Sequence, residues 1–195
     1  MSVMGSVDDV SAFGLNSWYW LNVPKKWVAG RELTVTTNTD TDFWRSTYYG
    51  FIRDSGHALL RSADEKFRLR ATFSGDYREQ YDQAGILVRL DERNWIKAGV
   101  EYVDGKQLLS VVVTRDFSDW SVFRPPVNPS SVTIDIHRRD DAVTLHYGLD
   151  GQEPNELLRL AYFPPGVPVA AGLMCASPEG HGFDVSFAAL RVMPS

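Results

Sequence analysis

The feature that most constrains the fold is a strict alternation of apolar and polar residues in short segments. In KFRLRATF, Phe67, Leu69 and Ala71 lie on one side of an extended chain, and the intervening residues are charged or polar. A period of two residues is typical of a half-buried β-strand. The clearest segments with this pattern are 66–73, 132–139, 142–149 and 183–192.

Turn sequences separate these segments, and no amphipathic helix longer than about two turns is evident. The turns contain Asp-Gly pairs at 104–105 and 150–151 and proline-rich stretches at 125–129 and 164–168. Segments 31–38 and 169–176 add two further candidate strands. Ten or so short, evenly spaced strands predict an all-β sandwich or barrel. We expect a single domain over residues 15–195, after a loose N-terminal lead-in at 1–14.

Composition narrows the class of protein and its partners. The net charge is −5 and the basic residues form no stripe, so we expect no nucleic-acid partner. No apolar run approaches the roughly 18 residues that span a bilayer, and the N-terminus lacks a signal-peptide pattern. One cysteine, Cys175, suits a reducing compartment. The histidines show no metal-ligand spacing. We therefore predict a cytoplasmic protein without membrane contact, metal or cofactor.

The segment NWIKAGVEY, residues 94–102, carries Lys97 and Glu101 on one side, with Gly99 between them. The Asp104-Gly105 pair predicts a two-residue type I′ hairpin. Closing that turn pairs 94–103 with 106–115 and places the apolar residues of both strands on one face. The other face then carries Lys97, Gly99 and Glu101.

The preceding strand, QAGILVRL at 83–90, joins through a three-residue loop if its apolar residues share the core face. This register aligns Gly85 with Gly99, beside Ser110. The outer face would then be a trough with a glycine and serine floor, walled by Lys97 and Glu101 roughly 13 Å apart. An alternative interpretation is that the glycines only allow the sheet to bend.

Longer stretches resemble a known family. TDFWRSTYYGF, YDQAGILVRLDERNWIKAGVEYVDG and LLSVVVTRDFSDWS, together with CASPEGHGFDVSF near the end, resemble the regulation-of-enolase-protein-like family of bacteria and fungi. The resemblance covers about residues 18–192. It implies a concanavalin A-like lectin and glucanase fold, a two-sheet antiparallel jelly-roll sandwich whose concave face binds saccharides in related folds. Its name implies a regulatory link to enolase.

Resemblance and register together predict a ligand site on the concave sheet. Gln83, Lys97 and Glu101 would form its centre, because they share the outer face. Aromatic faces take the C–H side of a sugar ring, and amide, carboxylate and ammonium groups bind its hydroxyls. The full set of predicted ligand-binding residues is Asp42, Trp44, Tyr49, Gln83, Trp95, Lys97, Glu101, Asp119 and Trp120.

Three functions remain open at this point. The first is binding of a carbohydrate or sugar-like small molecule without chemistry, with a regulatory role in sugar metabolism. The second is acid/base catalysis by Glu101 and Lys97, as a lyase, isomerase or glycoside hydrolase. A hydrolase needs two carboxyl groups, and the second would have to come from Asp42, Asp82 or Asp119. The alternation of side chains along the strand points Asp82 away from the concave face. The third is regulation of enolase or another metabolic enzyme by direct contact.

Overall fold

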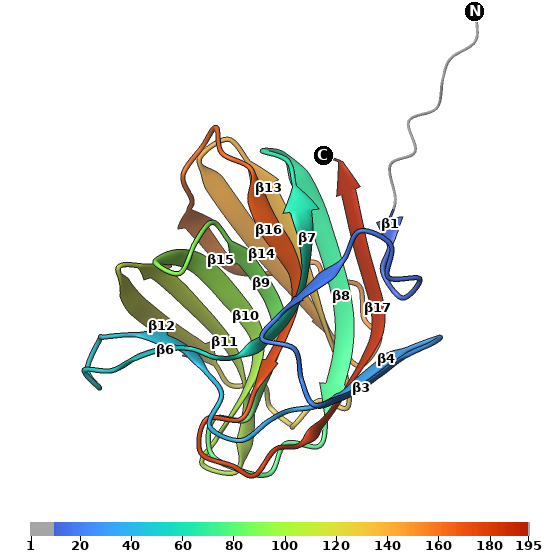
Figure 1. Ribbon diagram of the computed structural model, residues 1–195, viewed down its shortest axis with the longest axis vertical. Coiled ribbons are helices and arrows are strands. Elements are labelled where there is room, and N and C mark those ends of the chain that lie inside the picture. The colour runs from blue at the N-terminus through green and yellow to red at the C-terminus, as the bar shows by residue number, and fades with distance from the viewer. Residues whose placement is uncertain (1–9, 195) are drawn as a thin grey trace, which may run out of the picture.

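Two antiparallel sheets face each other in the computed structural model of the protein, which describes residues 10–194 (Figure 1). No helix occurs among these residues, and so none could cross a membrane. The fold is the predicted all-β, concanavalin A-like sandwich.

The two sheets contain fifteen of the strands. In spatial order the eight-stranded sheet contains β15 (Glu156–Tyr162), β14 (Ala142–Leu149), β13 (Val132–Arg139), β8 (Phe67–Gly75), β17 (Asp184–Pro194), β4 (Leu33–Thr36) and β3 (Lys26–Ala29), with β1 (Val10–Ser11) paired to β17. The seven-stranded sheet contains β12 (Phe117–Phe123), β11 (Lys106–Arg115), β10 (Asn94–Val103), β9 (Gln83–Arg89), β16 (Val169–Ala176), β7 (His57–Ala63) and β2 (Tyr19–Leu21).

Alternating side chains build the core between the sheets. Phe67, Leu69, Ala71 and Phe73 of β8 are all buried, and the residues between them are half-buried on the opposite face. They pack with inward residues of the seven-stranded sheet in one hydrophobic cluster. The predicted period of two is therefore confirmed as the pattern that assembles this sandwich.

The chain enters the sandwich earlier than the sequence suggested. Residues 1–9 of the expected 1–14 lead-in lie outside the described residues. Val10 and Ser11 pair with Val192 and Arg191 of β17, and Ala12 is fully buried. Residues 10 and 11 of that segment therefore belong to a sheet, because backbone pairing to β17 needs no apolar pattern that a sequence could display.

The central register is confirmed residue by residue. β10 pairs with β11 from Asn94–Arg115 to Val103–Lys106, and β9 pairs with β10 so that Gly85 lies opposite Gly99. Asp104 and Gly105 both have positive φ, 49° and 76°, as the type I′ turn requires.

The glycines do not form an exposed floor, and this expectation was wrong. Gly85, Gly99 and Ser110 are all buried. A Cβ on Gly85 would lie 2.0 Å from the carbonyl oxygen of Ala98, and one on Gly99 would lie 2.0 Å from that of Ala84. The two strands therefore require glycine where they approach closely, which supports the alternative that these residues shape the sheet.

A hairpin covers part of the outer face of the seven-stranded sheet. It consists of β5 (Phe43–Arg45) and β6 (Ile52–Asp54), and it projects beside β12 in Figure 1. A second hydrophobic cluster lies beneath it and joins Phe43 and Trp44 to Leu87, Trp95 and other outward residues of that sheet. The face that would otherwise be an open trough is therefore partly roofed.

The hairpin is fixed at both ends. Asp54 makes a two-point ion pair with Arg89 of β9, at 2.7 and 2.8 Å. The Arg45 amide donates to Ser118 Oγ of β12 at 2.9 Å. These contacts give the roof a defined position over the sheet.

Candidate functional site

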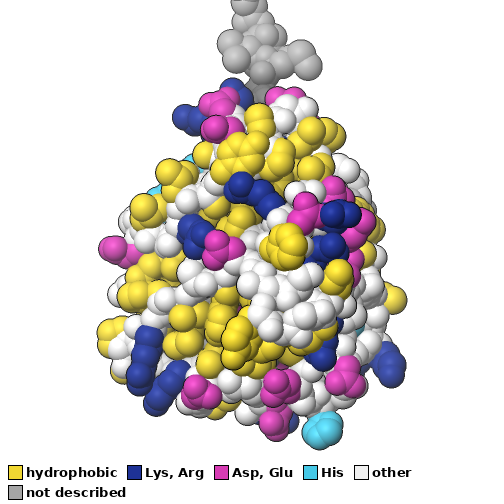
Figure 2. Space-filling model, turned by 90° about the vertical axis from the view of Figure 1, so that its left-hand side faces the viewer, with side chains coloured by type: hydrophobic (Ala, Val, Ile, Leu, Met, Phe, Trp, Pro, Cys, Tyr) yellow, Lys and Arg dark blue, Asp and Glu magenta, His cyan; other side chains and the backbone are white. Residues whose placement is uncertain are grey.

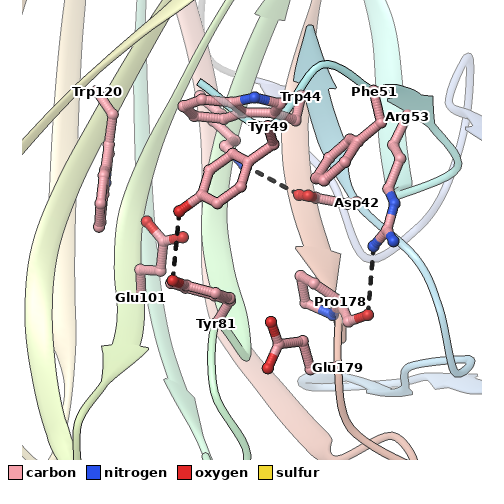
Figure 3. A pocket seen from close by; sticks show the side chains of 11 residues that line it. Asp42, Trp44, Tyr49, Phe51, Arg53, Tyr81, Glu101, Trp120, Pro178 and Glu179 are labelled. Atoms are coloured by element: carbon pink, nitrogen blue, oxygen red, sulfur yellow. Dashed lines mark hydrogen bonds and ion pairs between the residues drawn. The ribbon is translucent and has the colours of Figure 1, made fainter. Parts of the chain in front are cut away.

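A cavity of about 100 Å³ lies between this hairpin and the outer face of the seven-stranded sheet (Figure 3). Its base comes from β10, one wall from β12, the roof from the hairpin, and the mouth from the loop before β17. The lining residues are Asp42, Trp44, Tyr49, Phe51, Arg53, Tyr81, Lys97, Glu101, Trp120, Pro178 and Glu179.

Lys97 forms the polar base of the pocket. Its side chain is only 6% exposed, and its Nζ donates to Gln83 Oε1 at 2.6 Å and to Asp42 Oδ1 at 3.3 Å. Asp42 Oδ1 also accepts from Gln83 Nε2 at 3.3 Å and from the Phe43 amide at 2.8 Å. The ammonium is thus held in one place, and its charge is balanced by Asp42.

Glu101 is the third buried charged residue of the site, after Lys97 and Asp42, and it has no cationic partner at ion-pair distance among residues 10–194. Its Oε2 accepts a hydrogen bond from Ser110 Oγ at 2.8 Å. Ser110 Oγ in turn accepts a hydrogen bond from Trp120 Nε1 at 2.9 Å. Burial raises the pKa of the Glu101 carboxyl above its ordinary value, and Lys97 and Ser110 offset this only in part. A hydrogen-bonding or cationic group of a ligand would stabilise the ionised form.

Aromatic rings make the walls and roof. Tyr49 lies against Trp44 edge-on, with centroids 5.6 Å apart, and stacks on Phe51 at 5.5 Å. Tyr81 meets Trp120 edge-on at 6.4 Å. The hydroxyls of Tyr49 and Tyr81 lie 3.4 Å apart and close over Glu101 (Figure 3). This hydrogen bond, with burial, raises the pKa of Tyr49 to about 12, so the Tyr49 phenol stays neutral at physiological pH.

Charged groups flank the mouth. The Arg53 guanidinium lies 4.4 Å from the centroid of Phe51, and its Nη1 donates to the Pro178 carbonyl at 3.4 Å. Glu179 follows Pro178 in the same loop and also lines the pocket (Figure 3). The entrance therefore offers one cation and one anion to polar groups of an incoming molecule.

A buried carboxylate joins two of the loops that line the pocket. Asp82 Oδ1 accepts from Ser177 Oγ at 2.7 Å, and Oδ2 accepts from the amides of Arg78 and Glu79, each at 3.0 Å. Asp82 is fully buried and does not line the pocket, as the alternation of side chains predicted. It holds the loop carrying Tyr81 beside the loop carrying Pro178 and Glu179.

The structure brings most of the predicted residues together. Six of them line the pocket: Asp42, Trp44, Tyr49, Lys97, Glu101 and Trp120. Gln83 lies beneath them, beside a void of about 10 Å³, and orients Lys97 and Asp42 rather than facing the pocket.

Two predicted residues lie elsewhere. Trp95 is on the expected face but is 1% exposed, because Phe43 of the hairpin covers it, with ring centroids 6.1 Å apart. Asp119 pairs with Val113, so it lies on the opposite face of β12 from Trp120 and outside the pocket. Trp95 therefore supports the site from below, and Asp119 lines an adjoining groove on the surface rather than the pocket.

The predicted set missed Phe51, Arg53, Tyr81, Pro178 and Glu179. The first two had a usable signal, since Tyr49, Phe51 and Arg53 alternate along the hairpin and share its pocket side. Pro178 and Glu179 had none, because their position depends on the distant contact between Ser177 and Asp82. No cluster of three or more potential metal ligands occurs among residues 10–194.

Comparisons with known proteins agree with the fold. The family model described as "Protein of unknown function (DUF1349)" matches residues 20–195. Regulation of enolase protein 1 of Saccharomyces cerevisiae is 37% identical over 174 residues, which cover 89% of this chain and 87% of the relative.

Two solved structures illustrate the range of similarity. A functionally unknown protein from Saccharomyces cerevisiae has a TM-score of 0.87 and 36% identity, and the match covers 92% of this chain and 97% of that one. A GH43 protein from Bacillus licheniformis has a TM-score of 0.71 at 12% identity, and the match covers 98% of this chain but 40% of that one. The second likeness concerns the fold alone. The chain belongs to the DUF1349 family, and the yeast regulation of enolase protein is its relative at 37% identity.

Proposed function

We propose that the pocket binds a saccharide or a sugar-like small molecule. The observation that carries this proposal is the buried Glu101 carboxylate, unpaired with any described cation and surrounded by aromatic rings. Sugars need such a combination, because ring C–H groups pack on aromatic faces while hydroxyls need charged or amide partners. The neighbouring Lys97–Asp42 pair supplies both a donor and an acceptor within the same base.

The size of the cavity limits what can enter it. At about 100 Å³ it is smaller than the clefts of ~300–1,000 Å³ that enclose drug-sized ligands. One sugar ring or a compact polyol is therefore the unit that we assign to the closed part of the site.

The proposal is tested by thermal-shift screening of the protein against a panel of mono- and oligosaccharides, followed by calorimetry on each hit. In Glu101→Gln we expect affinity to fall at least about tenfold, since a charge-assisted hydrogen bond is lost. The melting temperature should stay within a few degrees, because Gln preserves the acceptor for Ser110. Glu156→Gln, an exposed change on the far edge strand, is the matched control. Unchanged affinity in Glu101→Gln, or the absence of any sugar hit, would contradict the proposal.

An acid/base enzyme is the second candidate, favoured by the raised pKa of Glu101. Glu101 would transfer the proton, and Lys97 would stabilise negative charge on the substrate. Glycoside hydrolysis fits less well than lyase or isomerase chemistry, because Asp42 is already paired with Lys97. Mass analysis of each binding sugar after prolonged incubation separates the candidates: a new product supports the enzyme, and an unchanged sugar supports a binder.

A regulatory link to enolase is the third candidate, and it rests on the name of the yeast relative. Direct binding of purified enolase would support it, particularly if a sugar that occupies the pocket altered that binding. Equal binding with and without such a sugar would separate this role from the pocket.

A further inference from the structure

A second, open groove adjoins the closed pocket. Its volume is about 660 Å³, and it shares Trp44, Tyr49 and Trp120 with the pocket. Its other walls include Tyr48 at the tip of the hairpin and Phe117 at the start of β12. The two cavities therefore share three aromatic walls, and the groove adds two further rings beside Thr47, Ser118 and Asp119.

The new rings of this groove are unusually exposed. Tyr48 is 94% exposed and Phe117 is 65% exposed. Figure 2 shows hydrophobic side chains gathered on the side of the molecule that carries β12 and the hairpin. The sandwich core does not need either ring, and adjoining exposed aromatic side chains are typical of a contact surface.

The hairpin tip presents Tyr48 in a defined position. Ser46, Tyr48 and Gly50 have positive φ values of 60°, 63° and 72°. The Ser46 amide donates to the Phe51 carbonyl at 2.7 Å, and Trp44 Nε1 donates to the Thr47 carbonyl at 3.0 Å. A tyrosine in the left-handed region is uncommon, and such strain concentrates at functional positions. The Tyr48 ring also meets Tyr49 edge-on at 5.1 Å, which links it to the pocket roof.

We infer that the ligand is an oligosaccharide held by one end, with its terminal ring in the pocket and the following rings on Tyr48 and Phe117 in the groove. This rests on the proposed function of the pocket. The pocket is closed enough for one ring and polar enough to hold its hydroxyls. The groove is open and largely aromatic, as suits the apolar faces of further rings that keep their hydroxyls in water.

The shared walls of the pocket and the groove favour an oligosaccharide as the molecule that occupies both. Trp44, Tyr49 and Trp120 each form a wall of both cavities, so a molecule that leaves the pocket passes directly onto the groove. A free monosaccharide would leave Tyr48 and Phe117 without a contact. A chain of linked rings would cover them.

The test is calorimetry on the full chain with two ladders of β-1,4-linked sugars: glucose, cellobiose and cellotriose, and xylose, xylobiose and xylotriose. We expect affinity in at least one ladder to rise about three- to tenfold for each added ring, the order expected for one aromatic contact. The double variant Tyr48→Asn, Phe117→Thr should abolish this rise and leave the monosaccharide affinity unchanged. Asn tolerates the positive φ at 48, and Thr suits the strand at 117.

Phe123→Thr is the matched control, because it removes an exposed ring of the same strand outside both cavities. Equal affinity along both ladders, or an undiminished rise in the double variant, would overturn the inference while the proposed function stands. If none of the six sugars and none of the wider panel binds, both the inference about the groove and the proposed function of the pocket are overturned. Loss of monosaccharide binding in the double variant would also count against the division into pocket and groove.

Discussion

At the scale of single residues, the buried charges of the site differ in whether they have an ion-pair partner. Lys97, Asp42 and Gln83 satisfy one another, so they form a rigid base. Glu101 has hydrogen bonds but no ion-pair partner among residues 10–194, and burial raises its pKa. The group that gains most from a ligand is therefore Glu101, whereas Lys97 already has an anionic partner in Asp42.

Gly99 provides a prediction about the sheet beneath the site. A Cβ there would lie 2.0 Å from the Ala84 carbonyl and 2.6 Å from the Cα of Gly85, both backbone atoms of the paired strand. Gly99→Ala should therefore lower the free energy of unfolding by at least about 3 kcal/mol in urea denaturation, because β9 and β10 must separate.

Gly30→Ala is the control for this change, because the nearest atom to its added Cβ is 3.9 Å away. We expect its free energy of unfolding to stay within about 1 kcal/mol of the wild-type value. A similar small effect in Gly99→Ala would show that the strands can move apart without cost.

At the scale of elements, a buried histidine ties β7 to the loop that carries Asp42. The Asn38 amide donates to His57 Nε2 at 3.0 Å, so Nδ1 carries the proton and donates to the Asn22 carbonyl at 2.5 Å. The carbonyl of Asn38 in turn accepts from Thr41 Oγ1 at 2.9 Å. Neutral His57 thus helps to position the segment 38–42.

This arrangement makes stability depend on pH. Burial lowers the pKa of His57 in the folded protein, so the unfolded chain binds the proton more readily. The free energy of unfolding should therefore fall as pH drops below about 6.5, the ordinary histidine value. Urea denaturation between pH 8 and 5 measures the effect.

His57→Gln should flatten this dependence, because Gln can donate to Asn22 and accept from Asn38 without titrating. His137 provides the comparison, since its pKa is also lowered but its ring lies on the surface beside Asp135. If His137→Gln flattened the profile more than His57→Gln did, the buried histidine would not be the main source of the pH effect.

At the scale of the whole molecule, Cys175 reports on the integrity of the sandwich. It lies in β16 between β7 and β9, it is buried, and burial raises the pKa of its thiol. Because it is the single cysteine of the chain, its alkylation by iodoacetamide can be followed without interference.

We expect native Cys175 to react more than about a thousandfold more slowly than in the unfolded chain. The free energy from labelling should equal that from urea denaturation, since a central strand opens only when the sheet does. Val127→Cys in a Cys175→Ala background is the exposed control. Fast labelling of native Cys175 at low urea would reveal local opening of β16 instead.

Much of the fold followed from local patterns in the sequence. Phe67, Leu69 and Ala71 had to share a face because the side chains of a strand alternate. The Asp104-Gly105 turn and the apolar faces on both sides of it determined the register from Asn94–Arg115 onward. A shift by one residue would have exposed Ile96, Ala98 and Val100 to water, so only one register was compatible with burial.

The sequence by itself therefore determined the strands, the central pairing and the face on which Lys97 and Glu101 lie, because these depend on neighbours along one hairpin. Only the tertiary structure decided that the 43–54 hairpin folds over that face, buries Trp95 and contributes Tyr49, Phe51 and Arg53. That choice depends on the free energy gained when Phe43 packs on residues more than forty positions away, such as Leu87 and Trp95. No local periodicity encodes such a contact, and so the open trough expected from the sequence is a roofed pocket in the folded protein.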